Sequence, residues 1–165
     1  MAGVGVAAVV AGVLLGSPQA DSPSGVAALR SARLTDLSGK PRWLSEWGGR
    51  ILVVNFWATW CPPCREEIPA LVRARDKLFS SGVEFVGIAI DHAVKVSEFA
   101  RIIQISYPLL IADAFGLDLV RKLGNPTGGL PFTLVLDRQG EVVHRNLGAV
   151  TQEQIEGQLL RLLAP

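Results

Sequence analysis

The sequence predicts a three-layer α/β sandwich around a mixed β-sheet. Residues 51–57 and 83–90 are mostly apolar and rich in β-branched or aromatic types, as in strands that are buried on both faces. Apolar residues at helical spacing follow each of these runs, over 61–80 and 93–103. This alternation predicts parallel strands joined by crossover helices, and a hairpin near the C-terminus adds antiparallel strands.

Turn and cap residues place the remaining elements. The other strands are expected at 33–37, 40–44, 109–112, 132–136 and 142–147, and the other helices at 114–123 and after Thr151. The last two strands flank the turn from Asp137 to Gly140, and the hydroxyl of Thr151 can cap the final helix. Residues expected to point into the core include Trp43, Trp47, Trp57, Val94 and Ile102.

The composition fits one folded domain and excludes one class of partner. The chain has 165 residues, of which 49% are hydrophobic, enough for a sizeable core. Its formal net charge is only +1, whereas proteins that bind nucleic acid usually carry a strong basic excess. We therefore expect no nucleic-acid partner.

The first 20 residues are expected to direct export. The apolar run from Val4 to Leu15 is shorter than the about 20 residues that a membrane span needs, and it matches the core of a signal peptide. No Lys or Arg precedes this run, so a retained N-terminal anchor and a leader without a targeting role stay open. Residues 21–31 are rich in Ser, Pro, Gly and Ala, which predicts a linker before a folded domain over 32–165.

The two cysteines, Cys61 and Cys64, lie where an expected strand gives way to an expected helix. At a helix N-terminus, unpaired backbone N–H groups and the helix dipole favour a thiolate and lower its pKa. Cys61 is therefore the expected nucleophile, and Cys64, one turn further along, would resolve the mixed disulfide that Cys61 forms. Pro62 and Pro63 have no N–H to offer the sulfur, which favours a reductant over an oxidant.

The cysteine motif and its surroundings resemble the bacterial TlpA/ResA-type thioredoxins. The resemblance rests on three stretches, which are Trp60 to Pro69, Gly87 to Asp91 and Gly129 to Gly140, and it covers about residues 32–163. It implies a thioredoxin-like sandwich with an N-terminal hairpin and an inserted helix and strand over 92–111. It also implies a thiol–disulfide oxidoreductase, for which we expect no cofactor.

The same resemblance assigns residues that face a substrate. Pro131 matches the cis-proline that lies opposite the cysteine pair, so the bond from Leu130 to Pro131 is expected to be cis. The backbone of Leu130 would then pair with an extended substrate peptide. Trp60 would shield one side of the nucleophilic sulfur and, with Pro62 and Pro63, would contact the substrate.

The resemblance also assigns a proton acceptor. Glu67 matches a carboxyl group that this family places behind the active-site helix, where burial can raise its pKa so that it takes the proton of the second thiol. Its neighbour Glu66 is expected to be an ordinary surface charge. Asn55 stands where thioredoxin proper has a buried Asp, and it cannot titrate.

These observations predict an enzyme that reduces disulfides of exported proteins in the periplasm or another extracytoplasmic compartment. A membrane thiol or electron donor would restore the dithiol, because an oxidising compartment has no thiol pool that could do so. We expect a monomer, with a possible membrane tether. Cytochrome c maturation is less favoured, because that branch usually has a Glu just after the cis-proline, where this chain has Phe132-Thr133.

Two other functions could use the same fold. A copper-delivery or metal-binding module could employ Cys61 and Cys64, and it would bind copper tightly without turning over disulfides. A zinc site would need two further ligands, and the two histidines, His92 and His144, are distant in sequence, so we expect no metal site. A peroxidase would need an isolated reactive cysteine, whereas both cysteines belong to one motif.

Overall fold

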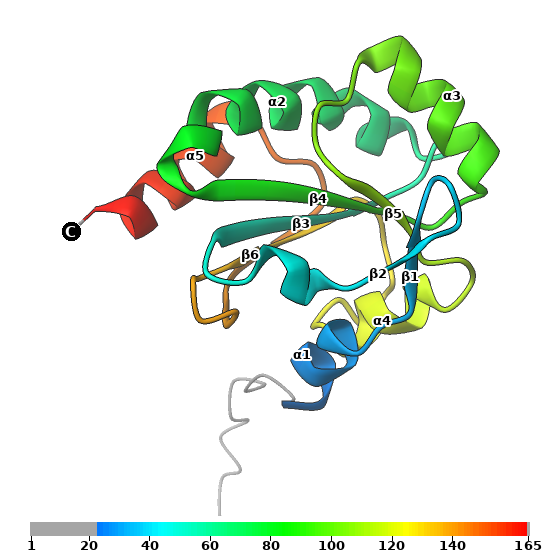
Figure 1. Cartoon of the computed structure of the whole chain (residues 1–165), viewed down its shortest axis with the longest axis horizontal. Coiled ribbons are helices and arrows are strands. Elements are labelled where there is room, and N and C mark those ends of the chain that lie inside the picture. Colours follow the sequence, from blue (N-terminus) through cyan, green and yellow to red (C-terminus); the bar gives the residue numbers. More distant parts are fainter. Residues whose placement is uncertain (1–22, 165) are drawn as a thin grey trace, which may run out of the picture.

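The computed structural model describes residues 23–164 and confirms the three-layer α/β sandwich (Figure 1). Its centre is a seven-stranded sheet with the order β2-β1-β5-β4-β3-β6-β7. The strands are β1 (Leu34–Asp36), β2 (Pro41–Arg42), β3 (Ile51–Trp57), β4 (Val83–Ala89), β5 (Leu109–Ile111), β6 (Phe132–Leu136) and β7 (Val142–Leu147).

The sheet is mixed, as the sequence predicts. Strand β4 runs parallel to β3 and β5, while β1 pairs antiparallel with β2 and β5, and β6 pairs antiparallel with β3 and β7. Every residue of β3 and β4 is buried, which accounts for their near-continuous apolar sequences. The cysteines therefore follow an interior strand.

Helices cover both faces of the sheet (Figure 1). They are α1 (Pro23–Arg30), α2 (Pro62–Leu78), α3 (Ala93–Ile103), α4 (Gly116–Lys122) and α5 (Gln152–Leu163), with short 3₁₀ helices η1 (Leu44–Trp47) and η2 (Phe79–Ser81). One core cluster packs α2, α3 and α5 on one face, and a second packs α1, α4 and η1 on the other. The inserted α3 and β5 and the N-terminal hairpin of β1 and β2 are both present, as the family resemblance implies.

The prediction of a linker over 21–31 is wrong for residues 23–30, which form helix α1. Leu29 is 1% exposed and belongs to the second core cluster. A Cβ atom on Gly25 would lie 2.2 Å from the carbonyl oxygen of Lys122, so glycine lets α1 approach the end of α4 closely. The small residues of this segment, which in sequence resemble a linker, thus allow α1 to pack closely against α4.

Three predicted core residues are exposed instead. Trp43 is 49% exposed, Val94 is 71% exposed and Ile102 is 68% exposed. In α3 the buried side is set by Val96 and Phe99, and residues 94 and 102 lie outside it. Trp57 is fully buried, as expected.

No helix within residues 23–164 is long and apolar enough to cross a membrane. The expected signal peptide or anchor over 1–20 lies outside the described residues.

Candidate active site

The cysteine pair occupies the first turn of α2. Cys61 is the N-cap residue of this helix, with extended backbone angles of φ −97° and ψ 105°, and Pro62 and Pro63 fill the first two helical positions. Cys61 and Cys64 form a disulfide whose Cα atoms are 5.3 Å apart. The backbone N–H of Cys64 donates to Sγ of Cys61 at 3.3 Å. Because both prolines lack an N–H, this is the first backbone donor that the helix offers to the sulfur.

The two sulfurs differ in access. Cys61 is 4% exposed, whereas Cys64 is fully buried on the inner side of α2. Trp60, directly before the pair, is 60% exposed, and Pro62 and Pro63 are exposed as well. Of the two cysteines, Cys61 is therefore the less buried and lies next to exposed residues.

The carboxyl group of Glu67 lies buried behind α2, with the residue only 3% exposed. Asn55 on β3 donates from Nδ2 to its Oε1 at 2.7 Å, and the backbone N–H of Val150 donates to its Oε2 at 2.9 Å. Asn55 Nδ2 also donates to Oγ1 of Thr133 at 2.9 Å. Glu67 follows Cys64 by three residues, a spacing that places both on one face of the helix.

Burial raises the pKa of Glu67 to about 7, against the opposing effect of the hydrogen bonds from Val150 and Asn55. A carboxyl group with such a pKa is divided between its acid and carboxylate forms near neutral pH. It can therefore both take and return a proton under ordinary conditions.

The loop from α4 to β6 contains the cis peptide bond between Leu130 and Pro131, as the resemblance implies. Asn125 is 2% exposed and donates from Nδ2 to the carbonyl oxygen of Gly129 at 2.7 Å. The N–H of Gly148 donates to the carbonyl oxygen of Pro131 at 3.0 Å. The loop is thus held by hydrogen bonds near both of its ends.

Asp91 fastens the turn that carries the cysteines. Its Oδ2 accepts from the backbone N–H of Thr59 at 3.0 Å and also from the Thr59 hydroxyl, and its Oδ1 accepts from the N–H of His92 at 2.7 Å. Partial burial alone would raise the pKa of Asp91, but these donors outweigh it and lower the pKa. The end of β4 is thereby joined to the segment just before Cys61.

Replacing Thr59 by Val removes the hydroxyl donor and keeps the shape of the side chain. The variant is expected to lose about 1–2 kcal/mol of stability and about 2–8 °C in Tm, as measured by thermal unfolding followed by circular dichroism. Thr35→Val on β1 is the matched control and should leave Tm nearly unchanged. A Thr59→Val variant as stable as its parent would show that Asp91 does not anchor this turn.

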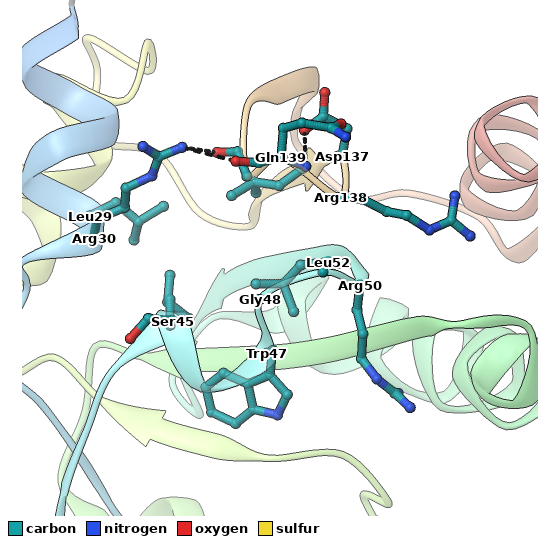
Figure 2. Close-up of a pocket in the computed structure, with 14 residues that line it drawn as sticks. Leu29, Arg30, Ser45, Trp47, Gly48, Arg50, Leu52, Asp137, Arg138 and Gln139 are labelled. Carbon is teal, nitrogen blue, oxygen red and sulfur yellow. Dashed lines mark hydrogen bonds between the residues drawn. The ribbon is translucent and has the colours of Figure 1, made fainter.

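Hollows lie on the surface at both ends of the sheet. A groove of about 460 Å³ begins at Trp60, the residue before Cys61, and is lined by Trp60, Ile90, Asp91, His92, Lys95, Asp113 and Ala114. Figure 2 shows another, a cavity of about 230 Å³ lined by residues that include Leu29, Trp47, Leu52 and Arg138. This cavity lies where β3 begins, whereas the cysteines follow the end of that strand.

The structure brings together most of the residues that the sequence singles out. Cys64 and Glu67 lie on α2 and Cys61 caps it, and the expected substrate-facing residues lie at the same end of the sheet, on α2, on the turn before it or on the loop before β6. His92 is exposed at the start of α3 and His144 is half-buried in β7. Within residues 23–164 no group of three or more His, Cys, Asp or Glu side chains could hold a metal ion.

Sequence reasoning missed the groups that hold the site in place. Asn55 was considered only as a residue that cannot titrate, yet its amide holds the carboxyl of Glu67. Thr133, 78 residues after Asn55, accepts a hydrogen bond from the same amide. Val150, 83 residues after Glu67, donates to its carboxyl group. Asn125 fixes the loop from a stretch that composition alone marks as irregular.

Comparison with known proteins decides the family. The family model described as Redoxin matches residues 23–159, which include α1 as well as the cysteine motif. The chain belongs to the Redoxin family.

Within this family the chain is similar to ResA-type proteins, which confirms the resemblance seen in the sequence. It is 34% identical over 127 residues to the thiol-disulfide oxidoreductase ResA of Geobacillus kaustophilus, covering 76% of this chain and 71% of that protein. It is 32% identical over 130 residues to ResA of Bacillus thuringiensis, covering 78% and 73%. The crystal structure of a secreted thiol-disulfide isomerase from Corynebacterium glutamicum superposes with a TM-score of 0.72 at 26% identity, covering 78% and 81%.

Proposed function

We propose that this Redoxin-family chain is an exported thiol–disulfide oxidoreductase that reduces disulfides of other exported proteins. The observation that carries the proposal is the Cys61–Cys64 pair at the first turn of α2, with Cys61 less buried than Cys64 and the buried Glu67 three residues after Cys64. The names of its ResA relatives and the secreted Corynebacterium protein support the activity and the export. The apolar segment Val4 to Leu15 would serve as the signal peptide or anchor.

The reaction proceeds in two exchanges. The thiolate of Cys61 attacks one sulfur of the substrate disulfide, forms a mixed disulfide and releases the other substrate sulfur as a thiolate. Cys64 then gives its proton to the carboxylate of Glu67, and the resulting thiolate attacks Sγ of Cys61. The second substrate sulfur leaves as a thiolate. The substrate disulfide has then gained two electrons, and the Cys61–Cys64 dithiol has been oxidised to a disulfide. A membrane donor of two electrons and two protons restores the dithiol.

The groove that begins at Trp60 offers a place for the substrate chain, because Trp60 exposes a large apolar surface there. The backbone of Leu130, next to the cis-proline, would pair with the extended substrate. Phe132, the residue after the cis-proline, is fully buried and stacks on Phe56 with ring centroids 6.0 Å apart. That position therefore offers no charged contact to a substrate. Disulfides between heme-binding cysteines are accordingly not favoured over those of other exported proteins.

The two prolines between the cysteines are the reason for proposing reduction of the substrate rather than its oxidation. Because Pro63 occupies the second helical position, where an N–H would point at the N-cap side chain, the Cys61 thiolate lacks one of its usual donors. A thiolate with less support makes the disulfide form relatively more stable and the couple more reducing.

The reduction potential of the pair tests this proposal. Equilibration against glutathione and dithiothreitol buffers is expected to give about −270 mV or below, as for a reducing thioredoxin. Pro63→Ala restores the missing N–H and should make the potential less negative by about 30 mV, whereas Pro62→Ala at the first helical position serves as the control. A potential near about −120 mV, that of a strong oxidant, would reverse the proposed direction.

A further inference from the structure

The loop that leads into the cis-proline is built around a buried asparagine. Asn125 lies just after α4 and is only 2% exposed, although its side chain is polar. Its backbone N–H donates to the carbonyl oxygen of Val120 at 3.2 Å, and its own carbonyl oxygen accepts from the N–H of Gly128 at 2.9 Å. Asn125 thus joins the end of α4 to the middle of the loop.

Both ends of the Asn125 side-chain amide have partners in the same loop. Nδ2 donates to the carbonyl oxygen of Gly129 at 2.7 Å. Oδ1 accepts from the hydroxyl of Thr127 at 2.8 Å, and the oxygen of that hydroxyl accepts from the N–H of Gly129 at 3.3 Å. Because a hydroxyl that donates to Oδ1 occupies the oxygen end of the amide, it holds Nδ2 toward Gly129.

These bonds set the direction of the peptide unit between Gly129 and Leu130. Among the described residues the bond from Leu130 to Pro131 is the only cis peptide bond, so the bond before it is trans. In a planar trans peptide the C=O and the N–H point in opposite directions. Since the buried Asn125 holds the carbonyl oxygen of Gly129, the N–H of Leu130 points away from Asn125.

The peptide unit on the other side of the cis-proline is held as well. The N–H of Gly148 donates to the carbonyl oxygen of Pro131 at 3.0 Å. Leu130 lies between the two held carbonyls and takes part in none of these bonds. Its half-buried side chain packs against the core cluster that contains Cys61 and Cys64. The backbone of Leu130 is therefore held in one orientation beside the core of the redox pair.

We propose that Asn125 is a positioning residue for substrate recognition, which turns the N–H of Leu130 outward to pair with the backbone of an extended substrate. The inference rests on the proposed function and deepens it. Main-chain pairing with an added strand gives affinity to a peptide, and a donor that is already oriented binds with less loss of conformational freedom. The preferred substrates are accordingly disulfides within extended chain segments rather than small disulfides.

The test follows formation of the mixed disulfide in the full chain carrying Cys64→Ser, which reacts once and stops. It compares the disulfide of a short extended peptide with that of blocked cysteine, which has the same reacting atoms and no chain on either side. The Cys64→Ser chain is expected to react faster with the peptide. Adding Asn125→Ala should lower the rate constant for the peptide about tenfold, the effect of one or two hydrogen bonds, and leave that for blocked cysteine unchanged.

Two further variants complete the test. Asn146→Ala is the matched control, because Asn146 on β7 also has a half-buried amide with two hydrogen bonds, both to Gln158. Its loss should leave the preference for the peptide as it was. Thr127→Val removes the hydroxyl that orients the Asn125 amide, and it should lower the peptide rate by a smaller factor. This variant decides the question if Asn125→Ala does not fold.

The outcomes separate this inference from the proposed function. An equal loss of rate with both disulfides, or no loss with either, would overturn the role of Asn125. If the Cys64→Ser chain reacted with both disulfides at the same rate, pairing at Leu130 would be contradicted while the proposed activity stood. A chain that reacted with neither disulfide would contradict the proposed function, and the inference would fall with it.

Discussion

The Cys64→Ser variant is expected to accumulate a stable mixed disulfide between Cys61 and a substrate protein. Cys61 retains its place at the start of α2, beside the exposed Trp60 and Pro62, so the first exchange proceeds. Without the second thiol, no group attacks Sγ of Cys61, and turnover falls to background. The adduct is measured by non-reducing gel electrophoresis and mass spectrometry after the variant is mixed with a disulfide-containing protein.

The reciprocal variant supplies the control. Cys61→Ser keeps the thiol of Cys64, but this residue is fully buried and should capture nothing. If Cys61→Ser trapped substrate as well as Cys64→Ser does, the two cysteines would not have the distinct roles assigned to them. Equal trapping would also require that α2 opens enough to expose Cys64.

Replacing Glu67 by Gln should slow release of the mixed disulfide by roughly 100-fold at neutral pH. Gln cannot accept the proton of Cys64, and a positioned base contributes about 10²–10⁴-fold to such a step. The rate is measured by stopped-flow mixing of the reduced enzyme with a model disulfide, which separates formation of the mixed disulfide from its resolution. Glu66→Gln, an exposed neighbour on the same helix, is the control and should react like the parent.

The same variant changes the pH dependence of stability. Because the pKa of Glu67 is raised from 4.5 to about 7 on folding, the folded state binds more protons than the unfolded state between these values. The free energy of unfolding of the disulfide form therefore falls as pH rises from about 4.5 to 7, by on the order of 3 kcal/mol from this residue. Urea unfolding across this window should show that decline in the parent and its loss in Glu67→Gln. A decline of equal size in both would mean that Glu67 is ionised at an ordinary pH.

Local patterns were sufficient to predict most of the fold. The apolar runs of β3 and β4 indicate buried strands, and the cysteines at the strand-to-helix junction indicate the redox pair. Helix α1 was missed because Gly25, which allows close packing on α4, looks the same in sequence as a linker glycine. Val94 and Ile102 were misplaced because α3 contains apolar residues on two sides and hydropathy alone does not choose between them.

The environment of Glu67 could not be predicted in the same way. The amide of Asn55 reaches it because β3 pairs with β4 and β6 in one particular register, and the N–H of Val150 reaches it because α5 packs against α2. Register and helix docking depend on contacts between distant parts of the chain. A single sequence records the residues that meet there but not the fact that they meet.

The bond from Val150 to Glu67 also has a consequence for protein synthesis. The two residues lie 83 positions apart, and the N–H of Val150 is added to the chain long after both cysteines. A growing polypeptide therefore carries its two thiols for much of its time on the ribosome without the groups that bury and hold the carboxyl beside them. During that interval the carboxyl group of Glu67 lacks one of its two hydrogen-bond donors, and the site is complete only when the segment before the last helix is in place.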